Sequence, residues 1–252
     1  MSVLLVTGGS RGIGAEICRV AATKGWDVAV NYASGADQAQ VVVDDIMNAG
    51  GKAIAVQADV SSSDEVEAMF ASVDEQLGPV TALINNAGTS GSTGPVDELD
   101  VAKTKRLMEV NVLGPFICAG AAIRRMAKRH GGGGGVIVNV SSAAAKHGGA
   151  GSYVDYAASK GAVDVFTVGL AREQAAEGIR VNCLRPGATM TEMNKKWMVE
   201  HPEWLDWVMA QVPLKRPGEV REIADVAMWL ISDESSYVTG AILDASGGWV
   251  SP

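Results

Sequence analysis

Short runs rich in β-branched residues alternate with longer helical patterns along the whole chain. The predicted strands are largely apolar, as strands buried on both faces require. This strict alternation predicts an α/β fold, a single Rossmann-type doubly wound parallel sheet with helices on both faces. The predicted strands are 3–7, 26–31, 53–58, 82–85, 136–140, 180–184 and 241–243; the predicted helices are 12–24, 37–49, 64–77, 102–129, 154–177 and 220–232.

Two local features qualify this pattern. Gly114-Pro115 falls inside the long stretch 102–129 and predicts a possible break there. The tract Gly131–Gly135 is the one low-complexity segment and is interpreted as a flexible surface turn ahead of a strand. No linker or block of charge divides the 252 residues, so we expect one domain over 1–252.

Composition excludes several classes of protein. The net charge of -8 argues against nucleic acid as a partner. No uninterrupted apolar run reaches the roughly 18 residues of a spanning helix, and no signal peptide is recognised, so we expect a cytoplasmic protein without a membrane partner. The cysteines, Cys18, Cys118 and Cys183, lie in apolar surroundings and are expected to be buried and reduced.

A glycine-rich segment joins the first predicted strand to the first predicted helix. Gly8, Gly12 and Gly14 allow a tight turn and a close approach of backbone N–H groups to an anion. The helix that begins there directs its positive end toward the same position. The spacing differs from the usual three-glycine fingerprint, and its place at the first strand–helix junction carries the prediction of a pyrophosphate site.

The residues after the second predicted strand bear on the choice of cofactor. An acidic residue there would bind the adenosine ribose of NAD, and Asn31, Tyr32 and Ser34 stand in its place. Arg11, inside the glycine loop, could reach a 2′-phosphate, with Asn31 and Ser34 as donors. The pattern favours NADP, with NAD possible, and the alternative is that Arg11 merely packs at the helix start.

Tyr156 and Lys160 are four residues apart in a predicted helix, so they share one helix face. A nearby ammonium group favours a phenolate, and such a pair can exchange protons with a substrate. The alternative interpretation is an ordinary pair on a helix surface. Tyr153 has no lysine four residues later and is interpreted as a pocket-wall or packing residue.

Taken together, these motifs resemble the classical short-chain dehydrogenase/reductase family over essentially the whole chain. The matching residues are Thr7–Gly14, Asp59-Val60, Asn85-Asn86-Ala87-Gly88, Asn111, Ser142, Tyr156 with Lys160, and Pro186-Gly187. The resemblance leans toward 3-oxoacyl reductases and glucose-dehydrogenase-like members. It implies a homotetramer that pairs through the two long helices and the C-terminal strand region.

The resemblance also implies four catalytic residues. Tyr156 would exchange a proton with the carbonyl or alcohol oxygen, and Ser142, rather than Ser141, would orient that oxygen. Lys160 would favour the phenolate and hold the nicotinamide ribose hydroxyls. Asn111 would anchor a water in a proton relay.

The implied cofactor contacts are more widely spread. Asp59 would receive the adenine amino group, and the backbone of Asn86, Ala87 and Gly88 would line the adenosine ribose. The full set of expected cofactor-binding residues is Gly8, Ser10, Arg11, Gly12, Ile13, Gly14, Asn31, Tyr32, Ser34, Asp59, Val60, Asn86, Ala87, Gly88, Tyr156, Lys160, Pro186, Gly187, Thr189 and Thr191. No metal site is expected, because His130, His147 and His201 lack ligand spacing.

The segment 190–211 is unusually rich in large side chains, with three of six tryptophans and four of ten methionines. In the family this stretch is a lid over the substrate, and soft side chains there would suit an apolar substrate. The alternative is that Trp204, Trp207 and Val208 pack the lid onto the body. A basic cluster, Arg124, Arg125, Lys128 and Arg129, is either a solvated helix end or a dock for an acidic carrier protein.

The sequence therefore predicts an NAD(P)-dependent oxidoreductase acting on a small-molecule carbonyl or secondary alcohol. The alternatives are a 3-oxoacyl-carrier-protein reductase of fatty-acid elongation and a sugar dehydrogenase. A non-catalytic NADP-binding sensor or scaffold is the alternative from a different class. An epimerase or dehydratase would normally need a longer C-terminal domain.

Overall fold

The computed structural model describes residues 2–200 and 203–249, which contain one seven-stranded parallel sheet. Its strands are β1 Val3–Val6, β2 Asp27–Tyr32, β3 Ala53–Gln57, β4 Ala82–Asn85, β5 Gly135–Val140, β6 Ile179–Pro186 and β7 Ile242–Ala245. Their order is β3-β2-β1-β4-β5-β6-β7, with Leu5 of β1 between Ala29 and Leu83. The predicted α/β class and all seven predicted strands are confirmed.

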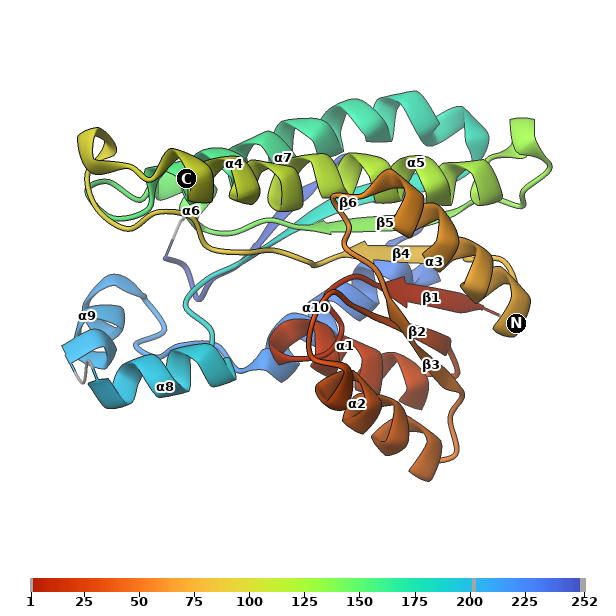
Figure 1. Cartoon of the computed structure of the whole chain (residues 1–252), viewed down its shortest axis with the longest axis horizontal. Coiled ribbons are helices and arrows are strands. Elements are labelled where there is room, and N and C mark those ends of the chain that lie inside the picture. The colour runs from red at the N-terminus through yellow and green to blue at the C-terminus, as the bar shows by residue number, and fades with distance from the viewer. Residues whose placement is uncertain (1, 201–202, 250–252) are drawn as a thin grey trace.

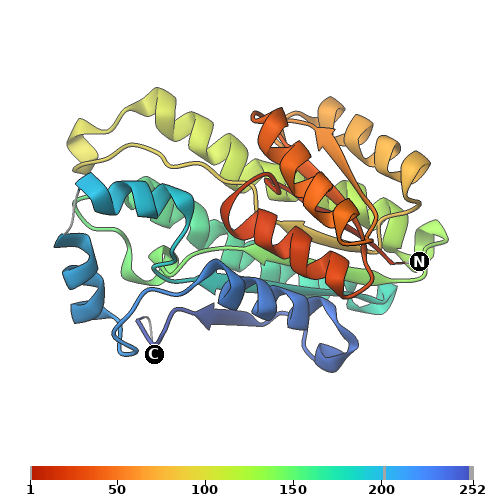
Figure 2. The ribbon, with the colours of Figure 1, turned by 90° about the horizontal axis from the view of Figure 1, so that it is seen from below.

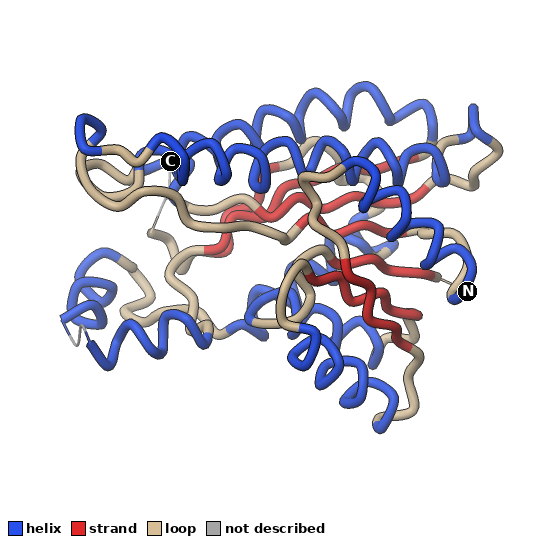
Figure 3. The backbone as a smooth tube through the Cα atoms, in the orientation of Figure 1, coloured by secondary structure: helices blue, strands red, loops and turns tan. Residues whose placement is uncertain are grey.

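Helices cover both faces of this sheet (Figure 1). One face carries α1 Gly12–Thr23, α2 Ala36–Asn48 and α10 Val220–Ile231; the other carries α3 Ser63–Gln76, α5 Gly114–Met126 and α7 Val154–Gln174. The tube in Figure 3 shows the strands running between these two layers. Figure 2, turned by 90°, shows α1, α2 and α10 side by side across their face.

Alternation along each strand builds two separate cores. Val3 and Leu5 point into the core beneath α3, α5 and α7, whereas Leu4 and Val6 point into the core beneath α1, α2 and α10. Successive strand side chains face opposite ways, so a strand covered on both faces is apolar at most of its positions. Each fully buried Leu or Val contributes roughly 1.5–3 kcal/mol.

The long helical stretch continues through its predicted break. Helix α4, Val101–Met108, passes into a π-helical turn at Glu109–Leu113, and α5 begins directly at Gly114. In place of a break at Gly114-Pro115, the helix widens into a π-helical turn just before these residues. Pro115 has no N–H to donate to a carbonyl of the preceding turn, and the wider turn accommodates it. By length and composition alone Val101–Met126 could cross a membrane, but here it packs against the sheet and α3.

The glycine tract differs from its prediction. The Gly134 N–H donates to the Met126 carbonyl at 2.8 Å, and a Cβ on Gly134 would lie 2.5 Å from the Gly178 carbonyl oxygen. Gly134 is close-packed and requires glycine for space and for its positive φ of 91°, whereas Gly131 and Gly133 are exposed, as a surface turn predicts.

Additional helices lie beyond the carboxyl ends of the strands. They are the short α6, Ala144–His147, and the pair α8, Glu192–Glu200, and α9, Glu203–Gln211. Figure 1 shows all three at the same end of the sheet. Single turns complete the described chain at Val96–Glu98, Lys128–His130, Ala175–Glu177 and Asp233–Ser235.

Candidate active site

The strand order changes direction between β1 and β4, and ligands of open α/β sheets bind at such a switch point. Here the two following loops are joined by hydrogen bonds. The Thr7 hydroxyl oxygen accepts from the N–H groups of Asn86 and Ala87 at 2.9 and 3.0 Å. The Asn86 amide donates to the Thr7 and Gly8 carbonyls, each at 3.0 Å. The predicted pyrophosphate loop is thus held against the loop after β4.

Glycine is sterically required in this cradle. A Cβ on Gly14 would lie 2.3 Å from the Gly8 carbonyl oxygen, and Gly8 itself has a φ of 63°. Helix α1 begins at Gly12, and no side chain caps its N-terminus. Its first N–H groups therefore have no side-chain acceptor, an arrangement compatible with the predicted anion site.

Contrary to the expectation from the sequence, the Asn31 side chain does not point outward as a donor for a 2′-phosphate. It is 1% exposed, its amide donates to the Val56 and Ala58 carbonyls, and its oxygen accepts from the Gly8 N–H at 3.2 Å. With both amide hydrogens engaged, Asn31 has no donor left for a ribose or a 2′-phosphate. Its side chain instead supports the glycine loop from beneath. Beyond it, Tyr32 is partly exposed and Ser34 is exposed.

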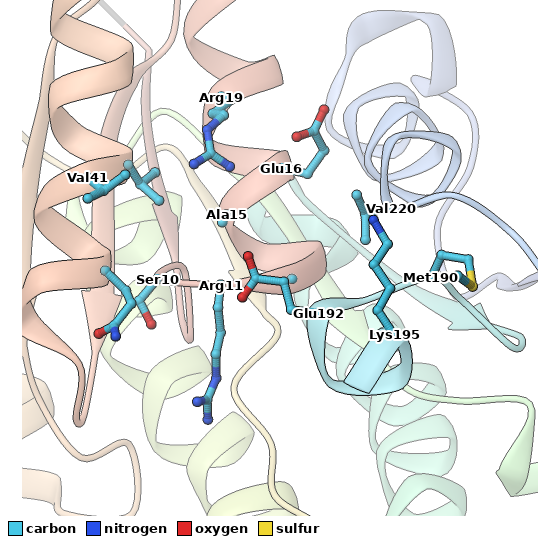
Figure 4. A pocket seen from close by; sticks show the side chains of 13 residues that line it. Ser10, Arg11, Ala15, Glu16, Arg19, Val41, Met190, Glu192, Lys195 and Val220 are labelled. Carbon is cyan, nitrogen blue, oxygen red and sulfur yellow. The ribbon is translucent and has the colours of Figure 1, made fainter. Parts of the chain in front are cut away.

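Arg11 lies in a hollow of about 260 Å³ between α1, α2 and α8 (Figure 4). Its side chain extends away from Arg19 and Glu16 in this view. Arg19 pairs with Asp45, but Arg11 makes no ion pair with any other residue in 2–200 or 203–249. An unpaired guanidinium beside the glycine loop can meet an anionic ligand.

Asp59 follows β3 and is held by two neighbours. Its carboxylate accepts from the Ser61 N–H and hydroxyl at 3.0 and 2.7 Å, and it pairs with Arg106 of α4. Burial acts to raise the pKa of Asp59, but the bonds from Ser61 and Arg106 outweigh it and hold that pKa below its ordinary value. Arg106 thus orients the carboxylate that was expected to receive adenine, and the sequence offered no signal for this pairing.

Tyr156 and Lys160 occupy the first two turns of α7. The Lys160 Nζ lies 5.7 Å from the Tyr156 ring centroid and donates to the Val140 carbonyl at 2.9 Å. Lys160 is only 4% exposed, whereas the Tyr156 ring is partly exposed. A Cβ on Gly88 would lie 3.7 Å from Nζ, so the loop after β4 reaches the lysine.

The two serines after β5 have different surroundings. The Ser141 hydroxyl is buried and donates to the Lys160 carbonyl at 3.0 Å. Ser142 is partly exposed, and its hydroxyl oxygen accepts from the Ala144 N–H at 3.1 Å. That bond leaves the Ser142 hydroxyl hydrogen for another acceptor. The environments therefore favour Ser142 over Ser141 as the serine that meets a substrate.

Asn111 stands in the π-helical turn and joins two segments. Its oxygen accepts from the Thr89 N–H at 2.8 Å, and its amide donates to the Thr89 carbonyl and the Ser159 hydroxyl at 3.0 and 3.2 Å. The Ser159 hydroxyl donates in turn to the Tyr156 carbonyl at 2.7 Å. Asn111 thereby braces the loop after β4 against the helix that carries Tyr156 and Lys160.

Asp155 has a role that the sequence reasoning missed. It is 5% exposed and accepts from the Ser92 N–H, the Thr104 hydroxyl and the Tyr156 N–H at 2.9, 2.9 and 2.7 Å. Burial acts to raise the pKa of Asp155, but these bonds outweigh it and lower the pKa. A carboxylate in the first turn of a helix, directly before the tyrosine, was the available signal.

The segment after β6 closes the site on its other side. Gly187 is packed so tightly that a Cβ would lie 2.7 Å from the Ser246 Cα, and its N–H donates to the Ala245 carbonyl at 3.0 Å. The Thr189 hydroxyl donates to the Gly187 carbonyl. The Thr191 side chain would lie 3.7 Å from a Cβ on Gly12, so the start of α8 lies over the glycine loop.

The remaining expected residues occupy the same end of the sheet. Ser10 lines the hollow beside Arg11, Ile13 packs on the core beneath α1, and Val60 is buried against Gly114. Cys18, Cys118 and Cys183 are buried and free, as predicted. No cluster of metal-ligating side chains occurs in residues 2–200 and 203–249, and His201 lies outside them.

Comparison with known proteins identifies the chain. A family model described as enoyl-(acyl carrier protein) reductase matches residues 8–250. The uncharacterized oxidoreductase YgfF of Escherichia coli is 47% identical over 248 residues, which cover 98% of this chain and 100% of that one. This chain belongs to the short-chain dehydrogenase/reductase family.

Other members of the family support this membership. Glucose 1-dehydrogenase 2 of Bacillus subtilis is 35% identical over 97% of this chain and 93% of its own. A solved short-chain dehydrogenase/reductase of Serratia marcescens superposes with a TM-score of 0.90 at 33% identity, covering 99% of this chain and 98% of that one. Members of this family are oxidoreductases that use nicotinamide cofactors and act on small molecules.

Proposed function

We propose that this chain is an NADP-preferring oxidoreductase that interconverts a carbonyl compound and its secondary alcohol. The observation that carries the proposal is the Tyr156–Lys160 pair, with Nζ 5.7 Å from the ring centroid, beside the Gly88 loop at the switch point. A surface pair would leave the lysine in solvent, but Lys160 is buried and hydrogen-bonded.

The residues present fit a dinucleotide. The glycine cradle leaves no room for a Cβ at Gly14, and the uncapped N-terminus of α1 supplies N–H donors for a pyrophosphate. Gly8, Gly12 and the backbone of Ala87 and Gly88 would line the nucleotide. The bound nicotinamide supplies or accepts the hydride.

The chain's own groups then handle the oxygen and its proton. The Tyr156 hydroxyl donates a proton to the carbonyl oxygen in reduction and takes it back in oxidation. The Ser142 hydroxyl donates a hydrogen bond to the same oxygen, where negative charge develops. The Lys160 ammonium group, 5.7 Å from the Tyr156 ring centroid, would hold the ribose hydroxyls. Asn111 fixes the backbone around both residues and anchors the proton relay.

Arg11 supports the preference for NADP. It is exposed, lies beside the glycine loop and has no ion pair within the described residues. Lys195 lines the same hollow. No carboxylate stands at the end of β2, where NAD would need one. Glu16 and Glu192 also line this hollow, so the preference for NADP rests on Arg11 and on the missing carboxylate at the end of β2.

Two further candidates have specific support. The family model's description favours an acyl-carrier-protein substrate, and the relative named glucose 1-dehydrogenase favours a sugar. Against the carrier, three of the four basic residues that would receive it are already paired: Arg124 with Glu67, Arg125 with Asp74 and Arg129 with Glu177. A sensor or scaffold would not need a buried Lys160 beside Tyr156.

We also propose a cytoplasmic homotetramer. Leu113 and Phe116 of the long helical stretch and Val165 of α7 are exposed on the outer layer, at 48%, 48% and 75%. Tyr237, just before β7, is fully exposed. These apolar side chains lie on the two surfaces expected to pair, and sedimentation analysis measures the assembly.

The function is tested with a panel of simple ketones, 3-oxoacyl thioesters and aldoses, each with NADPH or NADP⁺, followed by nicotinamide absorbance. At least one carbonyl–alcohol pair should turn over with wild-type protein and fail with Tyr156→Phe. Binding of NADPH without turnover of any member of the panel would favour the sensor or scaffold.

A further inference from the structure

A row of aromatic rings leads away from Tyr156. Tyr153 lies edge-on to Tyr156, with ring centroids 6.2 Å apart, and edge-on to His147 at 5.8 Å. His147 is tilted by 31° on Trp249 at 4.8 Å, and Trp207 stands edge-on to Trp249 at 5.4 Å. We call Tyr153, His147, Trp249 and Trp207 the aromatic row.

Four separate segments supply these rings. Tyr153 precedes α7, His147 ends α6, Trp207 belongs to α9, and Trp249 stands in the chain beyond β7. The tail that carries Trp249 is tied to the segment after α9, because the Leu214 N–H donates to the Gly247 carbonyl, and it folds into a local turn in which the Trp249 N–H donates to the Ser246 carbonyl. The row is therefore made by the tertiary fold and is fixed next to the reacting hydroxyl.

Packing of α9 onto the body does not account for the row. That packing is done by Val208 and Val212, which are 0% and 2% exposed. Trp207 remains 45% exposed, and the imidazole of His147 is exposed as well. Exposed aromatic rings that gather from several segments are typical of a ligand site.

The row carries no charge at neutral pH. Burial, and then the neighbouring Tyr156, raise the pKa of Tyr153, so its phenol stays protonated. Partial burial lowers the pKa of His147, outweighing a backbone hydrogen bond. The His147 Nδ1 accepts from the Gly149 N–H at 3.2 Å, so the neutral ring carries its proton on Nε2. An anionic substrate group would find no cation in this row.

We propose that the aromatic row holds a planar aromatic ring attached to the carbonyl carbon, so that the preferred substrates are aryl ketones and their secondary benzylic-type alcohols. A planar aromatic ring that meets other rings edge-on or offset gains binding free energy beyond what its buried area contributes. A puckered aliphatic ring of similar size lacks this additional attraction. This inference rests on the proposed carbonyl–alcohol function, and it names the substrate class.

The test compares two ketones of similar size, phenyl methyl ketone and cyclohexyl methyl ketone, in wild type, Trp249→Leu and Trp207→Leu. Wild type should favour the phenyl ketone in kcat/KM by about tenfold. Either substitution should reduce that ratio to about threefold or less. Trp229→Leu, a partly exposed tryptophan on α10, is the matched control and should keep the wild-type ratio.

A binding measurement separates this inference from the proposed function. In Tyr156→Phe, which retains the row, phenyl methyl ketone should quench tryptophan fluorescence saturably, and Trp249→Leu added to that variant should abolish the saturable part. Equal kcat/KM for the two ketones in wild type, or a Trp249→Leu ratio equal to wild type, would overturn the aromatic-row proposal. Saturable quenching without turnover of any ketone would support the row and overturn the oxidoreductase function.

Discussion

The ammonium nitrogen of Lys160 lies 5.7 Å from the centroid of the Tyr156 ring and donates a 2.9 Å hydrogen bond to the Val140 carbonyl. This bond connects α7 to the carboxyl end of β5. A second hydrogen bond, from the Ser141 hydroxyl to the Lys160 carbonyl, connects the same two elements. The lysine is thus fixed from both its ends, next to the loop that carries Gly88.

Tyr156→Phe should abolish turnover and leave cofactor binding nearly unchanged. The hydroxyl transfers the proton, whereas the ring only fills space, and general acid catalysis contributes about 10²–10⁴-fold. Steady-state kinetics and NADPH titration measure the two properties. Tyr153→Phe is the control for loss of a nearby hydroxyl. A Tyr156→Phe variant that retains more than about a tenth of wild-type kcat would contradict the assignment.

Lys160→Ala should weaken cofactor binding and lower kcat. Its ammonium group is proposed to hold the nicotinamide ribose hydroxyls, and it donates to the Val140 carbonyl. Steady-state kinetics and NADPH titration measure the two effects. If neither kcat nor the affinity changes, Lys160 has no part in the mechanism.

NADPH should be preferred over NADH, and Arg11→Ala should reduce the preference. A charge-assisted contact contributes about 1.5–3 kcal/mol, or roughly 10- to 150-fold in kcat/KM. Lys24→Ala, which removes an exposed cation at the far end of α1, should leave the ratio unchanged. A preference for NADH would reject the Arg11 argument and assign ribose recognition to Tyr32 and its neighbours.

Asp155→Asn should lower the free energy of unfolding at pH 7 by about 1.5–3 kcal/mol, because one acceptor is replaced by an amide donor facing the Ser92 N–H. The pKa of Asp155 is lowered in the folded protein, so its contribution is complete above the ordinary carboxyl pKa near 4 and is lost as the pH falls further. Urea unfolding measures this at pH 7 and at about pH 3. The difference in unfolding free energy between wild type and Asp155→Asn should be smaller at the lower pH.

The control for that prediction is Asp37→Asn, an exposed carboxylate in the first turn of α2. It should change the unfolding free energy at pH 7 by less than about 0.5 kcal/mol. If the difference in unfolding free energy between wild type and Asp155→Asn is the same at pH 7 and at about pH 3, the charge of Asp155 is not what stabilises this position.

Free ketones should be reduced without a carrier protein. The net charge of -8 repels an acidic carrier, and Arg124 and Arg129 are already paired with Glu67 and Glu177. Arg124→Glu with Arg129→Glu should affect a free ketone and a carrier-linked 3-oxoacyl substrate equally. Arg125 is left intact, because its guanidinium packs over the Phe70 ring. Selective loss of a fast carrier-linked activity would favour fatty-acid elongation.

The sequence by itself determined the layers of the fold and the chemistry placed at each end of the site. Apolar strands such as Leu4–Val6 have to be covered on both faces, and glycines at 8, 12 and 14 predict a backbone that approaches an anion. The i,i+4 spacing of Tyr156 and Lys160 fixes their common helix face. These properties are local, so they can be predicted from neighbouring residues.

Tertiary structure decided how the polar side chains are used. Asn31 turns inward because Gly8, Val56 and Ala58, which are distant in sequence, present their backbone groups to it. Asp155 is buried only because the Ser92 loop and α4 cover it. The aromatic row brings residues 147 and 249 together across a hundred intervening positions. Such contacts depend on how the elements pack, and no local spacing encodes them.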